Sequence, residues 1–136
     1  MIYITRKEHF SASHKLYKEE WSDTENDEVF GKCSNPNGHG HNYTVYVTVK
    51  GDPEPETGFL VNLKIISTLI NEHVIDLVDH KNLNEDVAFM KGIMPTTENV
   101  VKGIWGQLQP RLDELNCTLH CVKLQETENN YAEYFG

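Results

Sequence analysis

Apolar and polar residues alternate along two stretches in the first part of the chain. In residues 2–14, the residues that share one face are Ile2, Ile4, Phe10, Ala12 and His14. In residues 41–50 (HNYTVYVTVK), one face carries Tyr43, Val45, Val47 and Val49, and the other carries Asn42, Thr44, Tyr46 and Thr48. Successive side chains of a β-strand point to opposite faces of a sheet, so both stretches predict strands.

A helical spacing of apolar residues follows the break at residues 52–55 (DPEP). Behind Asn62, a residue that favours the N-cap, the apolar positions are Leu63, Ile66, Ile70, Val74 and Leu77, which predict a helix over residues 62–77. Residues 95–98 (PTTE) indicate a second helix start, with a hydroxyl cap and an early acidic residue. Pro110 lacks an amide proton, so we expect this second helix to end or kink near Gln109.

Two further strands are predicted at the end of the chain. They cover residues 118–126 and 131–135, and residues 127–130 (TENN) join them. Asparagine tolerates the left-handed conformation that such a turn requires. The predicted element order is ββααββ, an α+β fold in a single domain over residues 1–136, without internal repeats.

A long polar segment, residues 16–40, separates the first two strands. It has no apolar periodicity, it is rich in turn-forming residues, and it contains Cys33. A loop of this length is more often functional than a plain connection. We therefore expect it to contribute to a site.

The charge balance limits the partners of the protein. The chain has 21 acidic and 12 basic residues, a formal net charge of -9, which argues against a nucleic acid or an anionic membrane as partner. It has no apolar run long enough to span a membrane, and its N-terminus carries Arg6, Lys7 and Glu8 where a signal peptide would be apolar. The expectation is a cytoplasmic protein, with local basic residues if the substrate is anionic.

The cysteines favour a reducing compartment. There are three, an odd number, and Cys117 and Cys121 are four positions apart in a predicted strand. That spacing corresponds to roughly 13 Å along a strand, which is too far for a disulfide. Reduced thiols are therefore expected.

Three histidines form a candidate metal site. His39 and His41 are separated by one glycine at the entry to the second strand, so both rings point to the same face. His14 ends the first strand, and an antiparallel hairpin of the two strands would bring it back to the level of His41. Three neutral imidazoles with one open position are the ligand set of a catalytic zinc site. A bare His-x-His pair is more often two surface histidines, but the third histidine and the strand placement favour a metal site here.

The remaining histidines lack such support. His9, His73 and His120 have no second ligand at a suitable spacing, so we interpret them as ordinary surface or helix-face residues.

Six ordered blocks of sequence resemble the 6-pyruvoyl tetrahydropterin synthase family. The blocks are FSASHKL (10–16), SDTEN (22–26), FGKCSNPNGHGHNY (30–43), VDHKNLNEDV (78–87), PTTENV (95–100) and LQETENN (124–130). The resemblance implies a tunnelling fold, with a four-stranded antiparallel sheet and two helices on one face. It also implies trimers that close a β-barrel and stack into a homohexamer, with active sites between subunits.

The same resemblance implies roles for individual residues. His14, His39 and His41 would bind Zn²⁺, and Cys33, Asp79 and His80 would transfer protons. Glu126 would anchor the pterin ring, whose adjacent N–H and amino donors suit one carboxylate.

Several of these residues keep a second interpretation. Cys33 as a base would need a thiolate favoured by a charged His80 and the adjacent Lys32, but it could instead be a fourth zinc ligand or a loop cysteine without a role. Asp79 and His80 could be ordinary residues that follow a helix. Thr96, Thr97 and Glu98 either cap the second helix or line the pterin pocket as well. Lys15 and Lys32 are candidates to bind the phosphates, with Arg6 and Lys7 behind them.

Four functions remain in competition. The first is a zinc-dependent lyase that converts 7,8-dihydroneopterin triphosphate to 6-pyruvoyl tetrahydropterin with loss of triphosphate. The second is 6-carboxy-5,6,7,8-tetrahydropterin synthase of queuosine biosynthesis. Five residues separate Cys33 from His39, an interval that resembles the pyruvoyl branch of the family. The others are a non-catalytic pterin- or zinc-binding module and a zinc hydrolase, which would leave Cys33 and Glu126 unexplained.

Overall fold

A five-stranded sheet forms one layer of the protein in a computed structural model that describes all of residues 1–136. Its strand order is β3-β1-β2-β4-β5. The strands are β1 (Ile2–His14), β2 (His39–Gly51), β3 (Lys81–Asn82), β4 (Thr118–Thr127) and β5 (Asn130–Tyr134). The four longer strands pair antiparallel, as the family resemblance implies, whereas β3 pairs parallel to β1.

The sheet therefore has one short strand more than the four that were expected. β3 has only two residues, which pair with Ala12 and Ser13 of β1. A strand of two residues leaves no periodic signal in the sequence, and it exists only because residues 81–82 meet β1 in space. Both residues of this edge strand line a cavity that is described below.

The register of β1 on β2 places the histidines. The two strands pair without interruption from Ile2 opposite Gly51 to His14 opposite His39. His14 thus lies two residues away from the level of His41, which pairs with Ala12, so the expected level was wrong. His14, His39 and His41 still share one face, because positions two apart in a strand point the same way.

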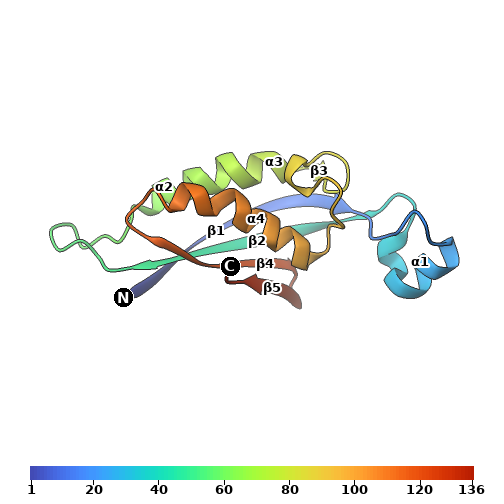
Figure 1. The fold of residues 1–136 in the computed structure, drawn as a ribbon, viewed down its shortest axis with the longest axis horizontal. Coiled ribbons are helices and arrows are strands. Elements are labelled where there is room, and N and C mark those ends of the chain that lie inside the picture. The colour runs from blue at the N-terminus through green and yellow to red at the C-terminus, as the bar shows by residue number, and fades with distance from the viewer.

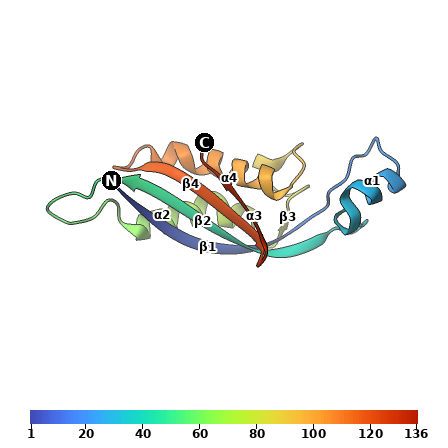
Figure 2. The ribbon, with the colours of Figure 1, turned by 90° about the horizontal axis from the view of Figure 1, so that it is seen from below.

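Helices cover one face of the sheet. α2 (Leu63–Ile70), the π-helical segment η2 (Asn71–Ile75) and α3 (Asp76–Val78) form one helical run, and α4 (Thr97–Leu112) lies beside it. Figure 1 shows these helices above the sheet, and Figure 2 shows the opposite sheet face free of helices. None of the helices has the length and apolarity needed to span a membrane.

The helix ends agree with the sequence except at Pro110. The Asn62 and Thr96 side chains cap α2 and α4 by accepting hydrogen bonds from the amides of Lys64 (2.9 Å) and Asn99 (3.2 Å). The expected end of α4 near Gln109 was wrong, because the helix continues to Leu112. Pro110 lies in the last turn, where a missing amide proton removes only one bond. Leu112 is buried, and its apolar contacts stabilise the last turn of the helix.

The segment between β1 and β2 is not a plain loop. It contains α1 (Asp23–Phe30) and a 3₁₀ turn, η1 (Gly31–Ser34), which projects from one end of the sheet in Figure 1. Ser22 caps α1 by accepting a hydrogen bond from the Glu25 amide (3.1 Å). Because α1 buries only Asn26, it has no apolar stripe by which periodicity could reveal it.

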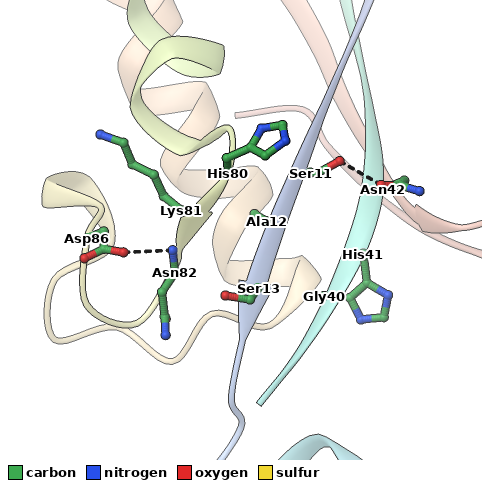
Figure 3. Close-up of a pocket in the computed structure, with 10 residues that line it drawn as sticks. All are labelled: Ser11, Ala12, Ser13, Gly40, His41, Asn42, His80, Lys81, Asn82 and Asp86. Carbon is green, nitrogen blue, oxygen red and sulfur yellow. Dashed lines mark hydrogen bonds between the residues drawn. The ribbon is translucent and has the colours of Figure 1, made fainter. Parts of the chain in front are cut away.

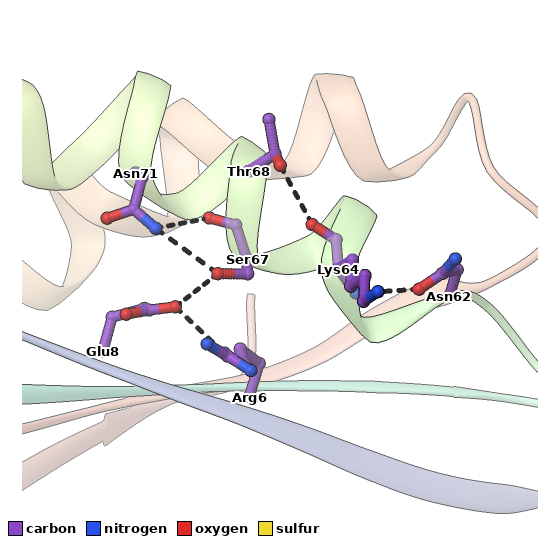
Figure 4. Close-up of polar contacts among 7 residues, drawn as sticks. All are labelled: Arg6, Glu8, Asn62, Lys64, Ser67, Thr68 and Asn71. Atoms are coloured by element: carbon purple, nitrogen blue, oxygen red, sulfur yellow. Dashed lines mark hydrogen bonds and ion pairs between the residues drawn. The ribbon is translucent and has the colours of Figure 1, made fainter.

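The core lies between the sheet and the helices. Its fully buried members include Val45, Val47, Ile66, Ile70, Ile104, Leu108, Val122 and Leu124. A polar contact also joins the layers: Ser67 of α2 donates a hydrogen bond to Glu8 of β1 (2.6 Å), and Arg6 donates one to the same carboxylate (2.9 Å) (Figure 4). His14 is 1% exposed at the end of this core, so its ring sits in a largely dry environment.

Candidate metal centre and active site

The three predicted metal ligands converge at the end of the core. One ring nitrogen of each of His14, His39 and His41 lies within 4.8 Å of the others. The His14 and His39 Nε2 atoms are 3.1 Å apart, and the rings meet edge to face. Such an arrangement, from two neighbouring strands, could hold one metal ion.

The surroundings of these rings fit a metal ion. The Nδ1 atom of His14 lies 2.8 Å from the Pro95 carbonyl oxygen, which orients the ring and leaves Nε2 for a metal. His39 Nδ1 and His41 Nε2 are buried without a hydrogen-bond partner in the protein. Burial lowers the pKa of His39 and of His41, which keeps both rings neutral and able to coordinate.

Several predicted site residues line one cavity with His14. This space of about 440 Å³, called here the histidine cavity, is lined by Cys33, Thr96, Thr97, Glu98 and Glu126 among others. They come from η1, the start of α4 and the end of β4. The structure thus brings together residues that are more than 100 positions apart in the sequence.

Glu126 is held at the edge of the metal cluster. Its Oε2 accepts a hydrogen bond from the Thr97 hydroxyl (2.7 Å), and its Oε1 lies 3.9 Å from His41 Nε2. Thr97 is therefore more than a helix-start residue, whereas the hydroxyl of Thr96 is used as the cap of α4. A carboxylate with one oxygen free can still accept hydrogen bonds from a ligand in the cavity.

The environment of Cys33 differs from the expected one. Burial, and then the negative charge of Glu126, raise the pKa of the Cys33 thiol. The thiolate-favouring contact with His80 is absent within a single chain. Cys33 therefore stays a neutral thiol unless a positive charge reaches it from elsewhere.

Asp79 and His80 lie in a different place. The edge cavity, a second space of about 510 Å³, is lined by His80 together with Ser11, Ala12, Ser13, Gly40, His41, Asn42, Lys81, Asn82 and Asp86 (Figure 3). The candidate metal ligand His41 thus lines this cavity, whereas His14 lines the histidine cavity. The linings of the two cavities share no residue. The structure thus separates Cys33 from the other two predicted proton-transfer residues.

The Asp79–His80 pair is nevertheless well ordered. One Asp79 oxygen lies 3.0 Å from His80 Nδ1, and the other accepts a hydrogen bond from the Ser11 amide (2.9 Å). The Ser11 amide and the contact with His80 lower the pKa of Asp79, so it stays ionised and orients the ring. The His80 side chain is 81% exposed, which leaves its Nε2 side open to a group from outside the chain.

Comparison with known proteins agrees with this architecture. A family model described as 6-pyruvoyl tetrahydropterin synthase matches residues 3–136. The chain belongs to the 6-pyruvoyl tetrahydropterin synthase family.

Relatives with two different activities in their names match almost the whole chain. The 6-pyruvoyl tetrahydrobiopterin synthase of Pongo abelii is 48% identical over 133 residues, which cover 98% of this chain and 90% of the relative. The solved structure of the Caenorhabditis elegans 6-pyruvoyl tetrahydropterin synthase has a TM-score of 0.90 at 38% identity and covers 99% of this chain and 95% of that chain. The 6-carboxy-5,6,7,8-tetrahydropterin synthase of Bacillus subtilis is 34% identical over 136 residues, 96% of this chain and 83% of the relative.

In this member of the 6-pyruvoyl tetrahydropterin synthase family, the predicted phosphate-binding lysines stay untested. Neither Lys15 nor Lys32 lines the histidine cavity. Arg6 is engaged with Glu8, and the Lys7 ammonium lies 5.7 Å from the Tyr46 ring centroid on the face without helices. Arg6 and Lys7 are thus occupied away from the cavity.

Tyr43 packs beside the metal cluster in this family member, with its ring centroid 5.6 Å from that of His41. Tyr43 is 1% exposed, stacks on Phe10 with ring centroids 4.8 Å apart, and its hydroxyl has no hydrogen-bond partner in the protein. Its position two residues after His41, on the same face, was the available signal. The alternation identified it only as a core residue.

Proposed function

We propose that this protein is a zinc-dependent lyase that converts 7,8-dihydroneopterin triphosphate to 6-pyruvoyl tetrahydropterin and triphosphate. The observation that supports it most is the convergence of His14, His39 and His41 beside a cavity that also contains Cys33 and Glu126. Membership of the 6-pyruvoyl tetrahydropterin synthase family supports a pterin as the substrate of this site.

Zinc is the metal that this ligand set favours. Three imidazoles without a carboxylate or thiolate among the ligands, and with one position left for a substrate, match catalytic zinc sites. When bound there, zinc would act as a Lewis acid on the side-chain oxygens of the substrate and so acidify the neighbouring C–H bonds.

Glu126 would orient the pterin ring. Its carboxylate is fixed by the Thr97 hydroxyl and retains accepting capacity toward the cavity. The ring N–H and the amino group of a pterin are parallel donors that one carboxylate can accept together. Thr96 and Glu98, which line the same cavity, would contact the ring edge.

Cys33 would remove a proton from the substrate side chain. Within one chain its pKa is raised, so the thiol needs a nearby cation to become a base. The exposed His80, oriented by Asp79, can supply that charge to the histidine cavity of another copy of the chain. We infer a homo-oligomer with shared sites, and we propose the homohexamer of two β-barrel trimers that the family resemblance implies.

A second function has a specific observation in its favour. The Bacillus subtilis relative bears the name 6-carboxy-5,6,7,8-tetrahydropterin synthase. It is 34% identical to this chain, against 48% for the Pongo abelii relative, which favours the pyruvoyl reaction.

Product analysis tests the proposal. The zinc-loaded protein is incubated with 7,8-dihydroneopterin triphosphate, and the products are identified by mass spectrometry. A pyruvoyl product with triphosphate supports the lyase, and a 6-carboxy product with acetaldehyde supports the second function. Phosphate release with an unchanged side chain would indicate a hydrolase, and binding without turnover a non-catalytic module.

A further inference from the structure

Residues 79–84, called here the strap, run along the outer edge of β1. The Asp79 side chain accepts a hydrogen bond from the Ser11 amide (2.9 Å), and the His80 amide donates one to the Ser11 carbonyl (2.6 Å). The β3 pairing with Ala12 and Ser13 follows, and the Leu83 amide donates to the Ser13 carbonyl (2.8 Å). The strap thus accompanies β1 residue by residue toward His14.

Asn84 closes the strap with its side chain. Its Oδ1 accepts a hydrogen bond from the Lys15 amide (2.7 Å), and its Nδ2 donates one to the Lys15 carbonyl (2.8 Å). The side-chain amide therefore pairs with Lys15 as a neighbouring strand would, at the point where β1 has ended. Its own amide donates to Asn82 Oδ1 (2.8 Å), which fixes the strap at this end.

The bond from the Lys15 amide holds the peptide group that joins His14 to Lys15, and the bond to the Lys15 carbonyl holds the next peptide group. On the other side of the first of these groups, a Cβ atom at Gly38 would lie only 2.6 Å from the His14 carbonyl oxygen. The peptide is thus confined between Gly38 and Asn84. The His14 ring that extends from it is aimed by the Pro95 carbonyl.

We propose that Asn84 is a positioning residue of the metal centre, which keeps the backbone of His14 in place so that its ring stays aligned with His39 and His41. This inference rests on the metal site of the proposed function. Asn84 contacts neither the metal position nor the histidine cavity, and it acts through Lys15 and the end of β1. Groups that orient metal ligands from outside commonly change metal affinity by about 10- to 100-fold when they are removed.

Asn26 provides a matched control within the same chain. Its Oδ1 accepts a hydrogen bond from the Lys18 amide (2.8 Å), and its Nδ2 donates one to the Lys18 carbonyl (3.0 Å). These two bonds match those of Asn84 to Lys15, and the Asn26 Nδ2 also donates to the carbonyl oxygens of Trp21 (3.4 Å) and Ser22 (3.2 Å). Asn26 stabilises the segment around α1, and the residue it clamps, Lys18, lies three positions farther from His14 than Lys15 does. Its loss should therefore affect folding and leave the histidines aligned.

The experiment measures zinc affinity by competition with a chromophoric chelator, at a temperature where every variant is folded by circular dichroism. We expect Asn84→Ala to weaken zinc binding by about 10-fold or more. Asn26→Ala should lower the melting temperature of the metal-free protein and bind zinc as the wild type does. Asn84→Asp, which keeps the acceptor for the Lys15 amide and loses the donor, should fall between Asn84→Ala and the wild type.

Equal zinc affinities in Asn84→Ala and Asn26→Ala would overturn the positioning role and leave the metal centre intact. If Asn84→Ala does not fold, Asn84→Leu decides the question, because it keeps the size of the side chain and loses both bonds to Lys15: wild-type zinc affinity in this variant overturns the role. A wild-type protein that binds no zinc refutes the proposed metal centre itself, together with the role of Asn84. The two failures are therefore distinguishable.

Discussion

The histidine cavity and the edge cavity use neighbouring positions of the same strand for different purposes. His14 points into the dry layer below the helices, where burial lowers the pKa of His39 and of His41 and raises the pKa of the Cys33 thiol. Ser11 and Ser13 contribute to the edge cavity, where the His80 ring is largely exposed. The first region holds the buried ring of His14, and the second leaves the ring of His80 open to solvent.

A single chain therefore contains the proposed base, Cys33, and the proposed cation, His80, but keeps them in different cavities. His80 and Cys33 line different cavities, and His80 is paired with Asp79 and not with Cys33. A second copy of the chain is the simplest source of the missing half. The variants below test this division, beginning with the largest expected effect.

Cys33→Ala tests the half that lies in the histidine cavity. We expect turnover to fall by about 10³-fold, the middle of the range for a lost general base, with zinc content unchanged. Cys117→Ala, at a partly buried thiol packed against the core, serves as the control and should remain active. Loss of zinc in Cys33→Ala would instead identify the thiol as a metal ligand.

His80→Ala tests the half in the edge cavity, and we expect a loss of about 10²-fold. Mixing decides whether sites are shared between copies. When Cys33→Ala and His80→Ala chains are co-refolded, a site with Cys33 from one chain and His80 from the other is intact, so part of the activity should return. Mixed oligomers that remain as inactive as the separate variants would contradict the division between two copies.

Gly38→Ala tests how closely the backbone of His14 is confined. Gly38 has φ 68° and would direct a Cβ against the His14 carbonyl oxygen, whereas Gly58, with φ 72°, has open space around that position. Both substitutions add the strain of a left-handed residue, about 1–2 kcal/mol in free energy of unfolding. Only Gly38→Ala should also reduce zinc occupancy, measured by elemental analysis. Equal occupancy in the two variants would indicate that the end of β1 yields without disturbing the rings.

Glu8→Gln has the smallest expected effect and probes the contact between the layers far from both cavities. Burial alone would raise the pKa of Glu8, but the hydrogen bonds from Ser67 and Arg6 outweigh it and leave the pKa below its usual value. The ionised carboxylate therefore stabilises the fold above the unfolded pKa of about 4.3, and this stabilisation is lost as the pH falls through the lower folded value.

We expect Glu8→Gln to lower the free energy of unfolding by about 1 kcal/mol near neutral pH, with a smaller difference in acid. Urea denaturation at several pH values measures it. The exposed Glu72→Gln is the control, and a difference that does not depend on pH would contradict the role of the charge.

The sequence predicted the parts that follow from periodicity. The bounds of β1, most of β2 (residues 41–50 of the observed His39–Gly51), the caps Asn62 and Thr96, and the convergence of His14 with His39 and His41 all follow from side-chain direction in strands and helices. The resemblance supplied Cys33, Asp79, His80 and Glu126, of which the structure places Cys33 and Glu126 together.

The rest depends on contacts between distant residues. β3 and the strap exist because residues 79–84 meet β1, and the clamp of Asn84 on Lys15 spans 69 positions. Helix α1 buries only the polar residue Asn26, so it has no apolar stripe from which the helix could be predicted. The separation of Cys33 from His80 was invisible in the sequence, since roles assigned by resemblance do not state which copy of the chain supplies each group.

The π-helical segment Asn71–Ile75 determines the direction in which the residues after it, including Asp79, point from the helical run. Each residue of an α-helix turns the chain by about 100°, so a wide turn with one additional residue rotates the helix end by nearly a third of a circle. Asp79 caps that end and reaches the Ser11 amide. A homologue that lost a single residue from this turn would still cover the core, yet its aspartate would face the wrong way. The number of residues in this helical run, and not only their kind, is therefore expected to be under selection.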